Sequence, residues 1–142
     1  MPQTNEFETP LGVIQSFESR ESATPSLVRS YDDKGRVYAL LDEQDGNIAI
    51  DVERYTQTIP DIFREFIADG EGPVDFYAKW TISEGISKLT GVPILEKLKK
   101  QELYSFPLEQ KFRINEEGIK FEGITCLFKE EELLISVIKR VT

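Results

Sequence analysis

The segment Leu133–Val141 restricts the fold more than any other part of the chain. Apolar residues occupy both its odd and its even positions, and β-branched residues are frequent. A strand with one face in water alternates apolar and polar residues, whereas a strand covered on both faces does not. The segment therefore predicts a central strand. It also contains the longest strongly apolar run, which is far shorter than the ~18 residues that a membrane span needs.

Turn-forming residues separate other segments with strand-like patterns. Gly35 ends a turn between residues 27–31 and 37–41, and Gly118 ends a turn in the C-terminal third. Glycine suits turn positions that need a positive φ. Between these turns one segment alternates strictly, with Ile48, Ile50 and Val52 against Ala49, Asp51 and Glu53. Alternation with period two between closely spaced turns predicts antiparallel strands.

The pattern over residues 119–128 changes part of the way along. Ile119 and Phe121 occupy odd positions, whereas Ile124 and Cys126 occupy even positions. An extra residue in one strand shifts all later side chains to the other face, so the change predicts a β-bulge at Gly123.

Two helices are expected, at about residues 60–69 and 93–103. Pro60 and Asp61 suit the first turn of a helix, and Gly70 suits its C-terminal end. Residues 74–82 alternate apolar and polar side chains over nine positions, and this pattern predicts a strand.

These elements predict an α+β fold with one antiparallel, strongly curved sheet or a partly closed barrel of about seven or eight strands and two helices. The 142 residues suit one domain. Residues 1–10 are expected to form a flexible N-terminal tail and residues 11–142 the single α+β domain.

The net charge of −9 lies in the N-terminal part of the chain. Residues 1–80 contain 16 acidic and 7 basic side chains, and residues 81–142 contain 10 of each. An acidic domain repels nucleic-acid phosphates and anionic lipids at long range. Six basic residues of the C-terminal half could form a local patch, but glutamates are interleaved with them and cancel its charge: Lys97, Lys99, Lys100, Lys111, Arg113 and Lys120. We therefore predict no nucleic-acid binding, no membrane insertion and a partner protein with a basic surface.

The chain contains no histidine and one cysteine, Cys126, within an apolar run. This removes the usual general base at neutral pH, the commonest transition-metal ligand and both common nucleophile–imidazole pairs. A calcium loop at Asp42 fails because Gly46 replaces the third ligand. We therefore predict no catalytic residues, no metal and no cofactor, and we expect Cys126 to be an inert core thiol.

Two aromatic residues and four acidic residues are the candidate partner interface. Aromatic side chains on an exposed sheet face are favoured in interfaces, and acidic side chains would meet a basic partner. The candidates are Tyr77, Tyr38, Asp42, Asp45, Asp51 and Glu53.

The sequence thus favours a non-catalytic interaction protein in the cytoplasm, an acidic accessory, assembly or inhibitor-like subunit. A terminal strand, Leu133–Val141 or Leu11–Phe17, could add to a partner's sheet. The alternative is a half-barrel that binds a small apolar ligand, or an enzyme that depends on a desolvated carboxylate. The sequence does not decide the oligomeric state, and a homo-oligomer is one possibility.

Overall fold

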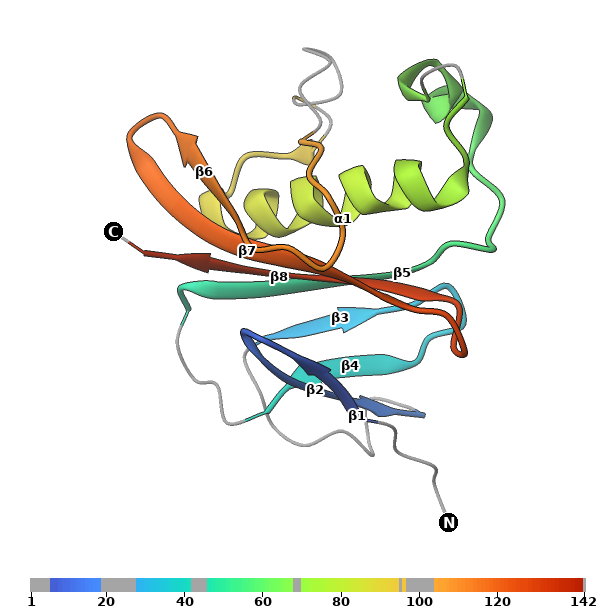
Figure 1. Cartoon of the computed structure of the whole chain (residues 1–142), viewed down its shortest axis with the longest axis horizontal. Coiled ribbons are helices and arrows are strands. Elements are labelled where there is room, and N and C mark those ends of the chain that lie inside the picture. Colours follow the sequence, from blue (N-terminus) through green and yellow to red (C-terminus); the bar gives the residue numbers. More distant parts are fainter. Residues whose placement is uncertain are drawn as a thin grey trace.

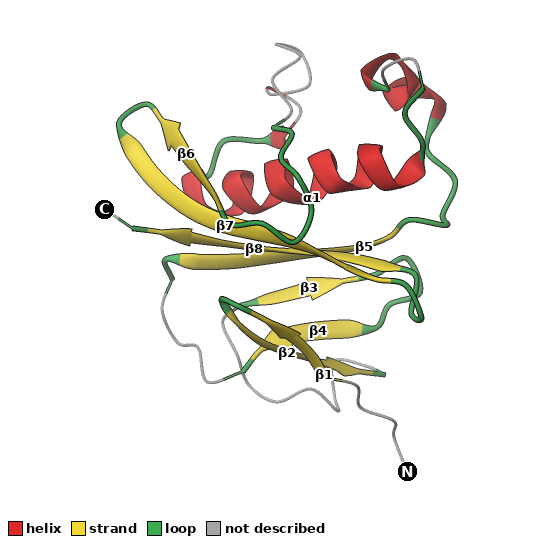
Figure 2. Ribbon diagram, viewed as in Figure 1, coloured by secondary structure: helices red, strands yellow, loops and turns green. Residues whose placement is uncertain are grey.

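The computed structural model describes residues 6–18, 28–41, 46–67, 70–94, 96 and 104–141. Within these ranges eight strands form two antiparallel four-stranded sheets, and a long helix covers one of them (Figures 1 and 2). The predicted α+β class with antiparallel strands is confirmed. No helix in the described ranges is long and apolar enough to cross a bilayer.

The single curved sheet or partly closed barrel is not confirmed, because both sheets are open. The N-terminal sheet has the order β1-β2-β4-β3, and the C-terminal sheet has the order β5-β8-β7-β6. The strands of the N-terminal sheet are β1 (Glu6–Thr9), β2 (Gly12–Phe17), β3 (Arg29–Tyr31) and β4 (Val37–Leu40). Those of the C-terminal sheet are β5 (Ile48–Arg54), β6 (Phe112–Glu116), β7 (Ile119–Phe128) and β8 (Leu133–Arg140).

Strand β8 is a central strand, as its sequence predicts. It pairs with β5 on one side and β7 on the other. The N-terminal sheet lies against one face of the C-terminal sheet and helix α1 (Pro73–Thr90) lies against the opposite face (Figure 1). The six residues Leu133–Ile138 are all buried, because one face packs on a sheet and the other on a helix.

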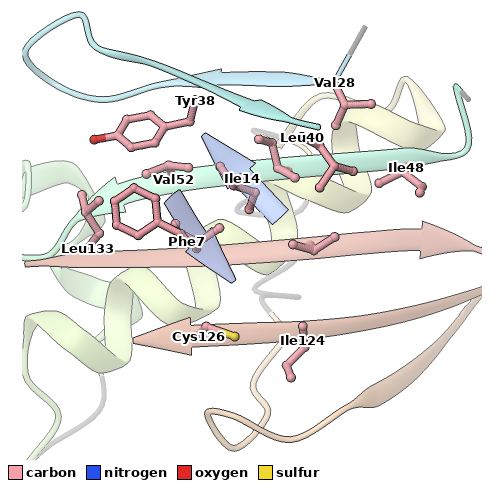
Figure 3. Packing of buried hydrophobic residues seen from close by; sticks show 13 residues of the cluster. Phe7, Ile14, Val28, Tyr38, Leu40, Ile48, Val52, Ile124, Cys126 and Leu133 are labelled. Atoms are coloured by element: carbon pink, nitrogen blue, oxygen red, sulfur yellow. The ribbon is translucent and has the colours of Figure 1, made fainter. Parts of the chain in front are cut away.

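The layer between the two sheets is apolar. Thirteen buried residues from both sheets form one cluster, and their labelled side chains point toward one another in Figure 3. Phe7 packs edge-on against Phe128, with ring centroids 5.0 Å apart. Phe7 belongs to β1, so residues 6–9 of the expected tail form a strand of the N-terminal sheet.

The predicted strand at residues 74–82 is wrong, because these residues belong to α1. Pro73 occupies the first turn, and the Asp75 carboxylate accepts a hydrogen bond from the Gly72 N–H at 2.9 Å. Gly91 ends the helix with φ 75°. These are ordinary start and stop signals of a helix.

The alternation misleads because α1 buries side chains on two sides. Toward the sheet lie small residues such as Gly85, where an added Cβ would lie 2.7 Å from Ile138 Cγ1. On another side, Trp80 packs against Phe63, with ring centroids 4.9 Å apart. A helix that is apolar on more than one side can match a two-residue period by coincidence.

The predicted bulge at Gly123 is also wrong. Strand β7 pairs residue by residue with β8, and Gly123 lies opposite both Phe112 and Ile138. Phe121 packs beneath α1, whereas Ile124 and Cys126 pack toward the N-terminal sheet. Because both faces of β7 are buried, the apolar positions can change parity without any extra residue.

The two predicted helices have different outcomes. The first is a short 3₁₀ helix, η1 (Asp61–Phe66), instead of the longer helix expected at 60–69. In the second, Ile94 and Glu96 are helical, but most of residues 93–103 lie outside the described residues.

Candidate functional site

Strand β5 carries acidic side chains toward α1. Its even-numbered residues, Ile48, Ile50 and Val52, belong to the layer between the sheets. Its odd-numbered side chains therefore point to the other face, where β5 and α1 are in contact. Two acids of β5 and two charged residues of α1 form what we call the β5–α1 acid cluster: Asp51, Glu53, Glu84 and Lys88.

Asp51 is the most deeply buried acid of this cluster, with 6% of its surface exposed. Lys88 Nζ lies 3.3 Å from its Oδ1, and the Ser30 hydroxyl donates to the same oxygen at 3.5 Å. Its Oδ2 is buried without a hydrogen-bond partner among the described residues. Burial raises the pKa of Asp51 well above its ordinary value, and Lys88 opposes this shift only in part.

Glu53 lies further along the same face. The Gln57 side chain donates to its Oε2 at 2.7 Å. Burial raises the pKa of Glu53 to about 7, and the charge of Glu84 acts in the same direction. Burial also raises the pKa of Glu84. The cluster therefore holds three carboxyl groups with raised pKa values, of which Glu53 titrates near neutral pH, in a chain without histidine.

Strand β3 lies beside the outer edge of β5, but among the described residues no strand pairs with this edge and side chains bind its backbone instead. Backbone bonds from Arg140 N to Asn47 O and from Tyr55 N to Glu132 O fix the odd-numbered residues as those that pair with β8. The even-numbered backbone groups point outward. The Val52 N–H donates to the Ser30 hydroxyl at 3.1 Å, and Lys88 Nζ donates to the Ile50 carbonyl at 2.7 Å. We call this boundary between β3 and β5 the β3–β5 seam.

Three cavities in the described residues surround these elements. One of about 260 Å³ opens at the β3–β5 seam and is lined by Lys88 but by no acid of the cluster. A second, of about 600 Å³, lies between the segment after β5 and the start of α1 and is lined by Gln57. A third, of about 160 Å³, lies beside the Lys79–Glu71 ion pair. In each of these three, the lining excludes Asp51, Glu53 and Glu84.

Four of the six interface residues predicted from the sequence lie in the described ranges, and none of these four is an exposed side chain. Tyr77, Tyr38 and Asp51 are buried, and Glu53 is partly buried. Asp42 and Asp45 lie outside the described residues. The structure brings Asp51 and Glu53 together on β5, and burial raises the pKa of Tyr77 to about 12 beside Glu53. Tyr38 lies in another layer, where its hydroxyl donates to Asp32 Oδ2 at 2.9 Å.

Burial keeps the side chains of Tyr77, Tyr38 and Asp51 from direct contact with a partner protein. Tyr77 was expected at the surface only on the assumption that residues 74–82 form a strand, and that assumption is wrong. A role of the six residues in partner binding stays a prediction, and for the buried ones it would act through their neighbours.

Two members of the β5–α1 acid cluster, Glu84 and Lys88, were missed in the sequence. Together with Trp80, which interacts with Glu53, they follow one another at intervals of four on α1, and this spacing places them along one side of the helix. The signal that could have found them is the helix start at Pro73 together with the stop at Gly91. These two residues define an 18-residue helix in which the spacing of four becomes meaningful.

Nucleophilic and metal chemistry find little support among the described residues. Cys126 is 3% exposed, and burial raises the pKa of its thiol to about 12. The Ser87 hydroxyl is buried without a hydrogen-bond partner there, while Lys88 binds the Ile50 carbonyl and Asp51. No group of three or more potential metal-ligating side chains occurs in the part of the chain that is described.

Comparison of the chain with protein-family models, with curated proteins and with solved structures found no match to any of them. The functional argument therefore depends on the geometry described above.

Proposed function

We propose that the protein is a non-catalytic interaction protein, an acidic accessory, assembly or inhibitor-like subunit, and that it binds its partner by strand addition at β1. The observation that carries the proposal is the position of β1 at the end of the N-terminal sheet, where β2 is its only strand neighbour among the described residues. An edge strand presents a row of backbone donors and acceptors to a second chain.

The two strands first expected to add to a partner are unsuitable. Leu133–Val141 contains β8, which already has neighbours on both sides, and Leu11–Phe17 contains β2, which lies between β1 and β4. Strand β1 is available in this respect because it is terminal in its sheet.

The side chains of β1 support a basic partner. Phe7 is buried, whereas Glu6 and Glu8 on the other face are exposed. A strand added beside β1 would place its alternate side chains next to these glutamates, and opposite charges on neighbouring strands are favourable. The excess of acidic residues in positions 1–80 would attract such a partner at long range.

A pull-down from extract of the source cells tests the proposal. We expect wild-type protein to enrich a partner, less so at high salt, and the double variant Glu6→Lys/Glu8→Lys to lose it. The matched control is Glu116→Lys/Glu117→Lys, at the end of β6 and in the turn that follows it, which makes the same charge change on the other sheet. No enriched protein, or equal loss with both double variants, would contradict binding at β1.

A second candidate function is the alternative given by the sequence, which is binding of a small apolar ligand or catalysis by a desolvated carboxylate. Glu53, with its raised pKa, is hydrogen-bonded to Gln57, and Gln57 lines the cavity of about 600 Å³. A cavity of this size suits a small ligand, and a carboxyl group that titrates near 7 suits general acid–base chemistry. A thermal-shift screen of small molecules tests it: a hit should stabilise wild type more than Glu53→Gln, and no hit would count against it.

A further inference from the structure

We propose that the cavity at the β3–β5 seam binds a carboxylate group, carried by the C-terminus of an extended peptide or by a small organic acid. This site is separate from the β1 edge and does not depend on strand addition there. The lining residues are Val28, Arg29, Gly46, Ile48, Ala49, Ile50, Lys88 and Leu89.

The backbone of β5 forms one wall of the cavity. Ile48 and Ile50 line the cavity, and their backbone groups point away from β8 for the reason given above. Among the described residues, no strand pairs with this edge. Backbone N–H groups at a strand edge can bind an extended chain or one oxygen of a carboxylate.

Two cationic side chains from different elements line the cavity, Lys88 of α1 and Arg29 of β3. Lys88 donates to the Ile50 carbonyl and to Asp51 Oδ1, and an ammonium group has three protons, so one remains for a ligand. Arg29 adds a second positive charge to the lining, and it also takes part in another interaction within the protein.

The remaining lining is apolar and limits the size of the ligand. Val28, Ile48 and Leu89 provide aliphatic surface next to the two cations. The volume of about 260 Å³ lies below the ~300–1,000 Å³ of most drug-sized sites. The cavity therefore suits a small acid or the last residues of a chain, with one apolar side chain beside the carboxylate.

Three probes test the site by amide chemical shifts of the ¹⁵N-labelled full chain. N-acetyl-valine has one carboxylate and one apolar side chain, N-acetyl-valine amide lacks the charge, and an acetylated tetrapeptide ends in valine with a free carboxylate. We expect the two acids to shift the amides of residues 46–50 and the amide to shift them far less. Tighter binding of the tetrapeptide assigns the site to a peptide terminus, and equal binding assigns it to a small acid.

Single substitutions distinguish binding in the cavity from a general effect of positive charge. Lys88→Met should weaken binding of the acids at least about tenfold, since a charge-assisted hydrogen bond is lost. Lys79→Met is the matched control, because Lys79 lies on the same helix but pairs with Glu71 beside another cavity. Asp51→Asn should tighten binding, because it removes the carboxylate that shares Lys88.

The Lys88→Met protein could fail to fold, because the substitution leaves the buried Asp51 without its cation. The double variant Lys88→Met/Asp51→Asn removes both members of the pair and should then show the same loss. The proposal is overturned if neither acid shifts residues 46–50 at millimolar concentration. It is also overturned if the acid and the amide bind alike, or if Lys88→Met and Lys79→Met have equal effects.

Discussion

The two faces of the C-terminal sheet are packed in different ways. Toward the N-terminal sheet most buried side chains are apolar, and the polar groups among the described residues include the Tyr38 hydroxyl, which donates to Asp32 Oδ2 at 2.9 Å, and the hydroxyls of Ser16 and Ser30. Toward α1 the packing includes a buried chain of hydroxyls, in which Ser136 lies 2.7 Å from both Thr81 and Thr125. The β5–α1 acid cluster borders the same helix.

The two layers are therefore expected to contribute differently: one supplies most of the folding stability, and the other makes that stability depend on pH and hydrogen bonding. Apolar burial depends little on pH or on individual hydrogen bonds, so the layer between the sheets is expected to supply most of the stability. Buried polar groups stabilise a structure only while each has a suitable partner and protonation state. The layer between the C-terminal sheet and α1 should therefore be the one that responds to conditions.

The largest expected effect comes from the layer between the sheets. Ile50→Ala removes a side chain with no exposed surface from this layer and should lower the free energy of unfolding by about 2–5 kcal/mol. Urea denaturation measures it. Ile62→Ala is the control, because Ile62 on η1 is 73% exposed and its loss should change little. Equal effects of the two variants would show that this layer does not dominate stability.

An intermediate effect is expected from the hydroxyl chain. Ser136→Ala leaves the hydroxyls of Thr81 and Thr125 without their shared partner, at a cost of about 1–3 kcal/mol. Ser105→Ala, at an exposed position, is the control for urea denaturation. An unchanged stability in Ser136→Ala would mean that the two threonines find other partners and that this layer tolerates polar loss.

The smallest effect is a pH dependence of stability. The pKa of Glu53 is about 7 in the folded protein against an ordinary value of 4.5, so the folded state binds the proton more tightly. Its contribution is present below pH 4.5 and is lost as pH rises through 7. The free energy of unfolding should fall between pH 5 and 8 by an amount on the order of 1 kcal/mol.

Glu53→Gln should reduce this slope, whereas Glu8→Gln at an exposed position should leave it unchanged. Asp51 and Glu84 have raised pKa values and act with the same sign, so part of the slope should remain. A wild-type stability that increases from pH 5 to 8 would contradict the shift. Without histidine in the chain, the expected slope has no imidazole explanation.

The strands were the most predictable part of the fold. The apolar pattern of Leu133–Val141 and the glycine turns report local geometry, and β8 and its antiparallel neighbours follow from them. Helix α1 was not predicted, because packing on more than one side gave residues 74–82 an accidental period of two. The bulge at Gly123 failed for a related reason, since a strand buried on both faces carries no reliable parity.

The candidate site was only half predictable. The alternation in β5 correctly groups Asp51 with Glu53 on one face. Their partners Glu84 and Lys88 are more than thirty positions away, and Ser30 is about twenty positions away in the other direction. Such contacts depend on how the layers stack, which periodicity in a single segment does not contain.

The chain has one tryptophan and one cysteine, and they lie in different layers. Trp80 belongs to the aromatic cluster around α1, and Cys126 faces the N-terminal sheet. The fluorescence of Trp80 can therefore follow the dissociation of α1 from the C-terminal sheet during unfolding. Thiol labelling of Cys126 can follow the separation of the two sheets. The wild-type protein thus contains one unfolding probe in each layer. The order in which the two layers separate during unfolding can be measured without introducing any substitution.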